Sequence, residues 1–117
     1  MNKREVGSRY EHNAAKFLLE QGYNILEKNF RCKMGEIDII GESDGYLCFI
    51  EVKYRSSSGY GFPSEAVDIR KRRRIVRTAL SYLNYHKLST DTPCRFDMVV
   101  ILDKEYTLIK NAFEGIW

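Results

Sequence analysis

The sequence predicts an α/β fold in which a helix, three strands, a second helix and a fourth strand follow one another along 117 residues. Two stretches, 6–21 and 69–87, carry apolar residues at helical spacing. Several shorter stretches are rich in β-branched and aromatic residues, and the dipeptide Asp44-Gly45 between two of them is a strong hairpin signal. At this length we expect one domain over residues 1–117, which buries roughly two-thirds of its unfolded surface.

The first helix is predicted over 6–21 and ends at Gly22, a residue typical of helix C-termini. Its apolar stripe consists of Tyr10, Ala14, Ala15, Phe17 and Leu18. Glu11 lies at the edge of that stripe, so it is either a third carboxylate of an inward-facing site or a boundary residue paired with Arg9 or a lysine. Residues 23–31 follow as a strand whose polar positions favour the edge of a sheet.

The hairpin over 35–53 is the part of the chain with the clearest chemistry. If Asp44 and Gly45 are the two loop residues, Ser43 pairs with Tyr46. Counting outward places Asp38 opposite Glu51 and Glu36 opposite Lys53, with all four on one face. A five-residue loop over 41–45 would instead move Glu51 to the opposite face.

Two carboxylates placed directly opposite each other, with Cβ atoms about 5 Å apart, destabilise a strand pair. A hard divalent cation removes the conflict, because Mg2+ is typically held by one or two carboxylates together with water and phosphate. Lys53 shares the face of Glu51 and can polarise a water or a phosphate oxygen. The alternative is a solvated face with ordinary charges, but the apolar neighbours indicate strands covered on both sides, where unpaired charges are costly.

The second helix follows a stretch over 54–63 without periodicity, which predicts a mobile loop beside the site. Its Arg and Tyr residues suit phosphate contacts and base stacking, and a mere connection is an equally good interpretation. Asp68 is the expected N-cap, and one side of the helix would carry Ile69, Arg73, Val76, Leu80 and Leu83. No acid occurs from 69 to 87, whereas six of the eight residues from 70 to 77 are cationic. This imbalance favours a polyanion over a merely solvated face, with phosphate contacts from Arg55, Arg70, Lys71, Arg74 and Arg77.

A fourth strand is predicted over 95–102 and a short fifth over 106–109. Asp97 lies at the polar start of the fourth strand, and we expect it to be structural, paired with Arg95 or with a helix terminus, with catalysis as the less favoured alternative. Cys32, Cys48 and Cys94 are odd in number and widely spaced, so they are expected to be free thiols rather than zinc ligands.

Composition narrows the class of protein. A hydrophobic content of 44% and a charged content of 30% are typical of a folded soluble domain, and the net charge of +3 is mild. The N-terminus is polar and no apolar run approaches the roughly 20 residues of a membrane span. These features predict a cytoplasmic protein without a membrane partner.

The order of elements, with Asp38 on the second strand and Glu51-Val52-Lys53 on the third, resembles the core of the PD-(D/E)XK nuclease superfamily. That resemblance implies a restriction-endonuclease-like fold, a central mixed β-sheet flanked by helices. More closely, the chain resembles the YraN family of small bacterial proteins, which is similar to archaeal Holliday-junction resolvases. The motifs that carry this resemblance are Gly7-x-x-x-Glu11, Asn29-Phe30-Arg31, Gly35-Glu36-Ile37-Asp38, Phe49-Ile50-Glu51-Val52-Lys53, Ala66-Val67-Asp68, Tyr82-Leu83, Arg95-Phe96-Asp97 and Asn111-Ala112-Phe113. One departure is Ile37, which stands where the superfamily motif has proline.

The resemblance implies roles for individual residues. Asp38, Glu51 and the Val52 carbonyl would hold Mg2+ or Mn2+, Lys53 would assist the nucleophile, and Glu11 would be an accessory acid. We therefore expect a Mg2+-dependent DNA endonuclease acting on branched or structured DNA, for which a symmetric homodimer would be natural. The alternatives are a nucleic-acid-binding module with little turnover and an interaction subunit of a repair, recombination or uptake assembly.

Overall fold

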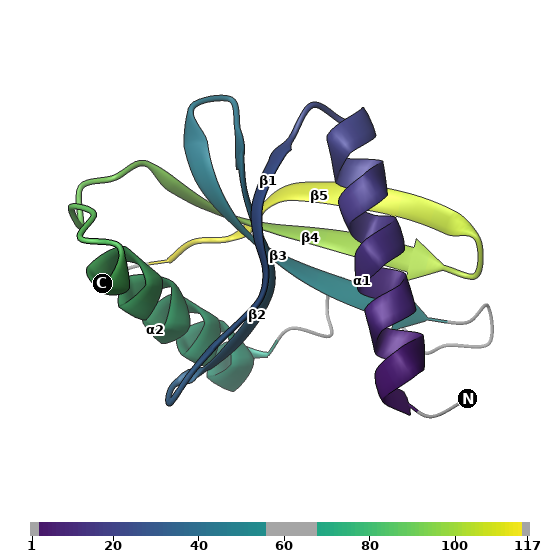
Figure 1. Ribbon diagram of the computed structural model, residues 1–117, viewed down its shortest axis with the longest axis horizontal. Helices are drawn as coiled ribbons and strands as arrows, with labels where there is room; N and C mark the ends of the chain where they lie inside the picture. Colours follow the sequence, from purple (N-terminus) through teal and green to yellow (C-terminus); the bar gives the residue numbers. More distant parts are fainter. Residues whose placement is uncertain (1–2, 56–67, 116–117) are drawn as a thin grey trace.

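The computed structural model describes residues 3–55 and 68–115, with side chains from residue 9 onward. Within these residues, two helices and five strands follow one another in the order α1, β1, β2, β3, α2, β4, β5 (Figure 1). Their bounds are α1 Lys3–Glu20, β1 Asn24–Cys32, β2 Gly35–Ser43, β3 Tyr46–Arg55, α2 Ile69–Tyr85, β4 Cys94–Leu102 and β5 Glu105–Phe113. This order confirms the α/β prediction and is compatible with a restriction-endonuclease-like core.

The strands form one mixed sheet in chain order, β1-β2-β3-β4-β5. Strands β3 and β4 run parallel, and the connection between them contains α2, whereas the other three pairs are antiparallel. β1 is an edge strand, as its polar positions predicted. The sheet thus places the acidic strands β2 and β3 side by side near its middle.

β5 is longer than the sequence predicted. Instead of ending at Ile109 it continues to Phe113, which pairs with Phe96. The polar residues Lys110 and Asn111 interrupt its apolar pattern, and a register shift in the ladder accompanies a φ of 53° at Asn111. Alternation is lost at such a bulge, so the second half of the strand gives no period-two signal.

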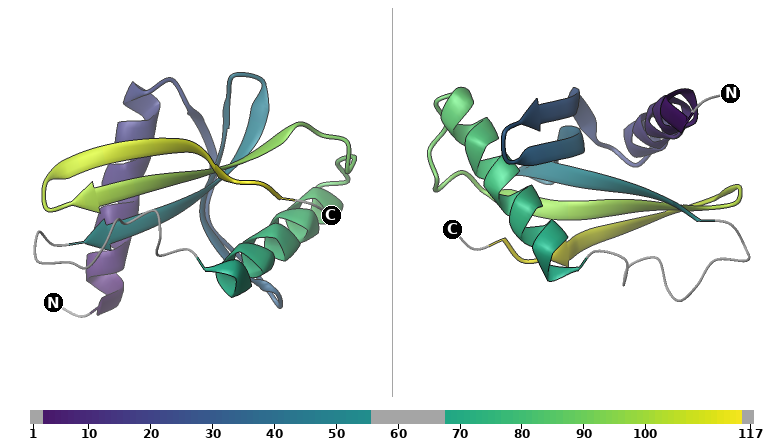
Figure 2. Two further views of the ribbon diagram at one scale, coloured as in Figure 1. Left: turned by 180° about the vertical axis from the view of Figure 1, so that it is seen from behind. Right: turned by 90° about the horizontal axis from the view of Figure 1, so that it is seen from below.

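The two helices cover opposite faces of the sheet (Figures 1 and 2). α1 packs Ala14, Ala15 and Leu18 against one face. α2 packs against the other with Ile75, Thr78, Ala79, Tyr82 and Leu83. The predicted side of α2 was therefore partly wrong: Leu83 is buried and Val76 and Leu80 flank the core, but Ile69 is 63% exposed and Arg73 faces solvent.

Local signals fix the ends of the helices. Gly22 has a φ of 93°, and the Tyr23 amide donates to the Leu18 carbonyl at 3.0 Å, which closes α1 in the manner of a Schellman motif. The Asp68 carboxylate accepts from the Lys71 amide at 2.8 Å and caps α2, as predicted. Within 3–55 and 68–115, neither helix is both long and apolar enough to cross a membrane.

The β1–β2 hairpin passes from one face of the sheet to the other. Ile39 packs on the α1 side, whereas Ile37 and its partner Phe30 pack on the α2 side. Between them, Asn29 adopts a φ of 58° opposite Asp38, which bends the hairpin at that point. In Figure 1 the outer end of this hairpin accordingly lies beside α2.

Candidate active site

The β2–β3 register is the one that the Asp44-Gly45 turn predicts. Ser43 pairs with Tyr46 and the ladder continues to Ile39 opposite Ile50, which rules out the five-residue loop. Asp44 and Gly45 have φ values of 55° and 81°, as a type I′ turn requires. The ladder ends at Ile39, so Asp38 and Glu51 lie at the first position where the two strands separate.

Asp38 turns its carboxylate toward the backbone of β3. Its Oδ2 accepts a hydrogen bond from the Val52 amide at 2.8 Å, a donor that the ladder no longer uses. Glu36 does not lie opposite Lys53 as the sequence predicted, because β2 has bent away. It forms an exposed ion pair with Arg31 of β1 at 3.1 Å instead.

Asp38 and Glu51 influence each other electrostatically at the point where β2 and β3 separate. Burial, followed by the nearby charge of Glu51, raises the pKa of Asp38 to about 7, against the opposing effect of the Val52 hydrogen bond. Glu11 and Glu36 raise the pKa of Asp38 further. Burial and the neighbouring acids thus both disfavour ionised Asp38, a condition that a bound divalent cation would relieve.

Two lysines face Glu51. Its Oε1 lies 2.6 Å from Lys71 Nζ and 3.5 Å from Lys53 Nζ. The side chains of Glu51 and Lys53 are 11% and 15% exposed, whereas that of Lys71 is 35% exposed. Burial and a hydrogen bond with Lys71 lower the pKa of Lys53. Burial would also lower the pKa of Lys71, but its hydrogen bonds with Glu51 and Lys53 outweigh that effect and raise it.

Glu11 joins the cluster from α1. Burial raises its pKa, a hydrogen bond with the Asn29 side chain lowers it, and the charges of Glu36 and Glu51 act on it as well. The neighbouring Tyr10 ring stacks on Tyr54 of β3 with ring centroids 4.1 Å apart, which holds α1 against the end of that strand. Glu11 is therefore close enough to interact electrostatically with the acids of β2 and β3.

The five cations predicted to contact phosphate have different surroundings. Arg70, Arg74 and Arg77 are exposed on α2, whereas Lys71 is engaged by Glu51. Arg55 belongs to β3 rather than to the loop, and its guanidinium donates to the Tyr54 carbonyl at 2.9 Å. The rest of the predicted loop, from residue 56 onward, lies outside the described residues.

A hollow of about 730 Å3 adjoins the cluster between the β1–β2 turn and the start of α2. Its lining consists of Arg31, Cys32, Gly35, Glu36, Lys71, Arg74 and Ile75. The sequence did not predict that Arg31 would line a hollow beside the site, although Arg31 belongs to the motif Asn29-Phe30-Arg31. Nor did it predict the ion pair of Lys71 with Glu51, because that contact depends on how α2 packs on the sheet.

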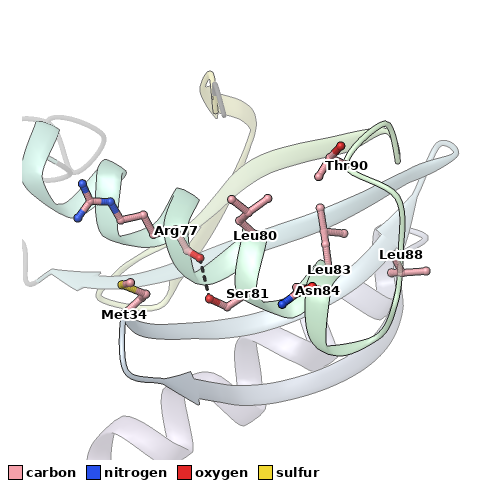
Figure 3. A pocket seen from close by; sticks show the side chains of 8 residues that line it. All are labelled: Met34, Arg77, Leu80, Ser81, Leu83, Asn84, Leu88 and Thr90. Carbon is pink, nitrogen blue, oxygen red and sulfur yellow. Dashed lines mark hydrogen bonds between the residues drawn. The ribbon is translucent and has the colours of Figure 1, made fainter.

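A second hollow of about 440 Å3 runs along the other end of α2 (Figure 3). Met34, Leu80, Leu83 and Leu88 give it a mostly apolar lining, and Ser81 donates to the Arg77 carbonyl at 3.1 Å at its edge. The acids and lysines of the cluster are not among its lining residues. It is thus a separate feature.

The point where β2 and β3 separate offers only a few oxygen donors for a metal ion. Within the described part of the chain, no three Asp, Glu, His or Cys side chains are arranged so that they could hold one metal ion. A metal here would therefore rely on Asp38, Glu51 and a backbone carbonyl such as that of Val52. Such a sparse set of oxygen donors suits Mg2+, which usually keeps several waters, better than ions that need a full cage of side chains.

Comparison with known proteins gives one consistent result. The profile of a family described as "Uncharacterised protein family UPF0102" matches residues 10–101. A UPF0102 protein of Lachnoclostridium phytofermentans is 54% identical over 98% of this chain and 98% of that protein. Similar proteins of Acetivibrio thermocellus and Coxiella burnetii are 49% and 43% identical over 96% and 94% of this chain, and 93% and 92% of their own lengths.

Proposed function

Because the chain belongs to the uncharacterised family UPF0102, the YraN family, we propose its function from the site itself: a Mg2+-dependent DNA endonuclease acting on branched or structured DNA. The observation that carries the proposal is the pair of acids, Asp38 and Glu51, at the point where β2 and β3 separate. Burial and repulsion by Glu51 raise the pKa of Asp38 to about 7, and a divalent cation bound between the two acids would offset this cost of ionising Asp38.

Asp38, Glu51 and the Val52 carbonyl would hold the ion. When bound, Mg2+ would supply positive charge to the phosphate oxygens as the phosphodiester bond is cleaved. The hydrogen bond from the Val52 amide fixes the orientation of Asp38, so one carboxylate of the pair is already held in place. Glu11 would be an accessory acid at the edge of the cluster.

Lys53 would orient or deprotonate the attacking water. Its ammonium is paired with Glu51 and its side chain is nearly buried, so its position is well defined. Burial and the neighbouring Lys71 lower the pKa of Lys53, which favours a role in proton transfer over a role as a fixed cation. Lys71 then carries the charge that opposes Glu51.

The cations around the opening support DNA as the substrate. Arg31, Lys71 and Arg74 line the hollow beside the acids, and Arg70 is exposed on the same turn of α2 as Lys71. Phosphate contacts of this kind position a nucleic acid without reading its sequence. Preference would then come from the shape of the DNA, as in a resolvase-like enzyme.

The main alternative is a nucleic-acid-binding module or interaction subunit of a repair, recombination or uptake assembly, with little turnover. The basic surface of α2 would serve such a protein equally well. The opposed acids would not, because they weaken binding to a polyanion and contribute nothing to it. For this reason we favour the enzyme.

A cleavage panel tests the proposal. Labelled duplex, flap and four-way junction DNA are incubated with and without Mg2+, using wild type and a Glu51→Gln variant purified alongside. We expect Mg2+-dependent cutting by wild type, at least about 1,000-fold slower cutting by the variant, and weaker Mg2+ binding by the variant in calorimetry. Binding of the panel without cutting by wild type would instead support the binding module.

A further inference from the structure

Lys71 both pairs with Glu51 and lines the hollow beside it. Its Nζ is 2.6 Å from Glu51 Oε1, and its side chain also lines the hollow that contains Arg31 and Arg74. Lys53, the other partner of Glu51, is not among the residues that line this hollow. Lys71 is therefore the one cation among the described residues that can serve either the acids or an anion in the hollow.

The charge balance explains why Lys71 sits at Glu51 without a metal. Asp38 and Glu51 contribute two negative charges when both are ionised, and Lys53 and Lys71 contribute two positive ones. A divalent cation at the two acids would leave an excess of positive charge. A metal and both ammonium groups cannot all lie against Glu51 at little cost, because like charges at such distances repel strongly.

The side chain that gives way should be the more mobile and more exposed one. Lys71 is 35% exposed on the first turn of α2, compared with 15% for Lys53 on the central strand β3. A lysine has a flexible four-carbon stem, so its ammonium can swing while its backbone stays in place. The lysine that leaves would thus be Lys71.

The hollow offers a destination. It measures about 730 Å3, enough for a phosphate group with its waters, and Arg74 follows Lys71 by one helical turn. Arg31 is held there by an exposed ion pair with Glu36, the type of pair that contributes little and is readily exchanged. A backbone phosphate would meet three cations at this place.

We propose that Lys71 is an exchangeable counter-ion: it neutralises Glu51 in the metal-free protein, and when a divalent ion takes its place it moves to a DNA phosphate in the hollow beside Arg31 and Arg74. This inference rests on the proposed nuclease site. Its consequence is that metal and DNA bind cooperatively, since each ligand favours the position of Lys71 that the other needs. Linkage makes the effect reciprocal.

The test measures binding rather than cleavage. Ca2+ replaces Mg2+, because it also takes oxygen ligands, and the DNA is checked to be intact afterwards. Calorimetry gives the Ca2+ affinity of wild type, Lys71→Met and Arg74→Gln, and anisotropy gives their affinity for a four-way junction with and without Ca2+. Circular dichroism confirms that each variant is folded.

We expect Ca2+ to strengthen junction binding by wild type at least about fivefold. Lys71→Met should bind Ca2+ about three- to tenfold more tightly when free of DNA, because the competing ammonium is gone, and its coupling factor should fall at least about threefold. Arg74→Gln is the matched control from the same hollow. It should weaken junction binding with and without Ca2+, while its Ca2+ affinity and coupling factor stay at wild-type values.

Wild-type Ca2+ affinity or wild-type coupling in Lys71→Met would overturn the exchange. Failure of the nuclease proposal has a different signature. In that case Glu51→Gln would bind Ca2+ as tightly as wild type, whatever Lys71→Met does. The two ideas can therefore be rejected separately.

Discussion

Asp38 and Asp97 are aspartates on strands of the same sheet, yet their surroundings are opposite. Asp97 of β4 is 1% exposed and receives hydrogen bonds from three residues: Tyr23 Oη at 2.6 Å, the Arg95 guanidinium at 2.9 Å and the Asn111 amide at 2.8 Å. Asp38 of β2 has one backbone donor, Val52, and an acid as its neighbour. Asp97 is thus matched by a cation and three donors, whereas Asp38 has one donor and lies beside another acid.

The difference distinguishes a cluster that stabilises the fold from the site that we propose to be functional. The cluster of Tyr23, Arg95, Asp97 and Asn111 ties the start of β1, the middle of β4 and the bulge of β5 together with matched donors and a matched charge. It also confirms the expectation that Asp97 pairs with Arg95. At Asp38, burial and the neighbouring Glu51 disfavour the ionised form, a perturbation of the kind that is frequent at functional sites.

The largest effect on stability is expected at the Asp97 cluster. Asp97→Ala would remove the buried acceptor of Arg95 and Tyr23 and leave Arg95 paired only with the exposed Asp44, at a cost of about 3–5 kcal/mol. Urea unfolding measures this loss. Asp91→Ala, at an exposed aspartate, is the control and should change stability by less than about 0.5 kcal/mol. Equal effects of the two substitutions would remove the structural role of Asp97.

The opposite sign is expected at Asp38. Because the pKa of Asp38 in the folded protein is raised to about 7, the fold favours its neutral form. The unfavourable contribution of the ionised form therefore grows as pH rises from about 4 to above 7. In chelator, we expect Asp38→Asn to be more stable than wild type by about 1–3 kcal/mol at pH 8, because Asn is neutral and can still accept from Val52.

Thermal or urea unfolding of both proteins across this pH range measures the difference. The advantage of Asp38→Asn should shrink steadily toward pH 4, where wild-type Asp38 is protonated as well. If the difference in unfolding free energy does not vary with pH, ionisation of Asp38 does not destabilise the fold.

A smaller loss is expected from Tyr23→Phe, which removes one of the donors to Asp97 and leaves its charge paired with Arg95. We expect a cost of about 1–2 kcal/mol in urea unfolding. Tyr85→Phe, at a ring that is 77% exposed, should cost almost nothing. A cost for Tyr23→Phe as large as that of Asp97→Ala would mean that the hydroxyl, rather than the ion pair, holds this cluster together.

In the Asp38 cluster, Lys53→Ala should leave DNA affinity nearly unchanged and slow turnover by about 100-fold or more. Lys53→Arg should not restore the rate, since arginine stays charged and its planar fork differs from an ammonium. Single-turnover cleavage together with anisotropy separates the two quantities. Full activity of Lys53→Ala would show that this lysine has no part in the chemistry.

The weakest effect per residue is expected at the exposed cations of α2. Converting Arg70 and Arg74 to Gln should weaken junction binding equally for different sequences. It should also reduce the slope of log affinity against log salt by up to about 1.8, at roughly 0.9 per phosphate contact. The matched control converts two exposed lysines elsewhere, Lys16 and Lys104, to Gln and should leave the slope unchanged. An unchanged slope in the arginine variant would exclude this part of α2 from the DNA interface.

Features that depend on near neighbours in the chain follow from the sequence alone. The Asp44-Gly45 turn fixed the register of β2 and β3, because both residues can adopt positive φ and a two-residue loop leaves one pairing. Counting residues outward from that turn was then enough to put Asp38 and Glu51 at matching positions. Gly22 and Asp68 likewise marked the helix ends through their own backbone and side-chain chemistry.

The surroundings of those acids, in contrast, depend on tertiary packing. The separation of β2 from β3, the bend at Asn29 and the return of Glu36 to Arg31 depend on how the β1–β2 hairpin crosses the sheet. The contact of Lys71 with Glu51 depends on which side of α2 is buried, and apolar spacing alone placed Ile69 on that side incorrectly. Local pattern sets the geometry within a turn or a ladder, whereas packing between elements far apart in the chain decides which charges meet.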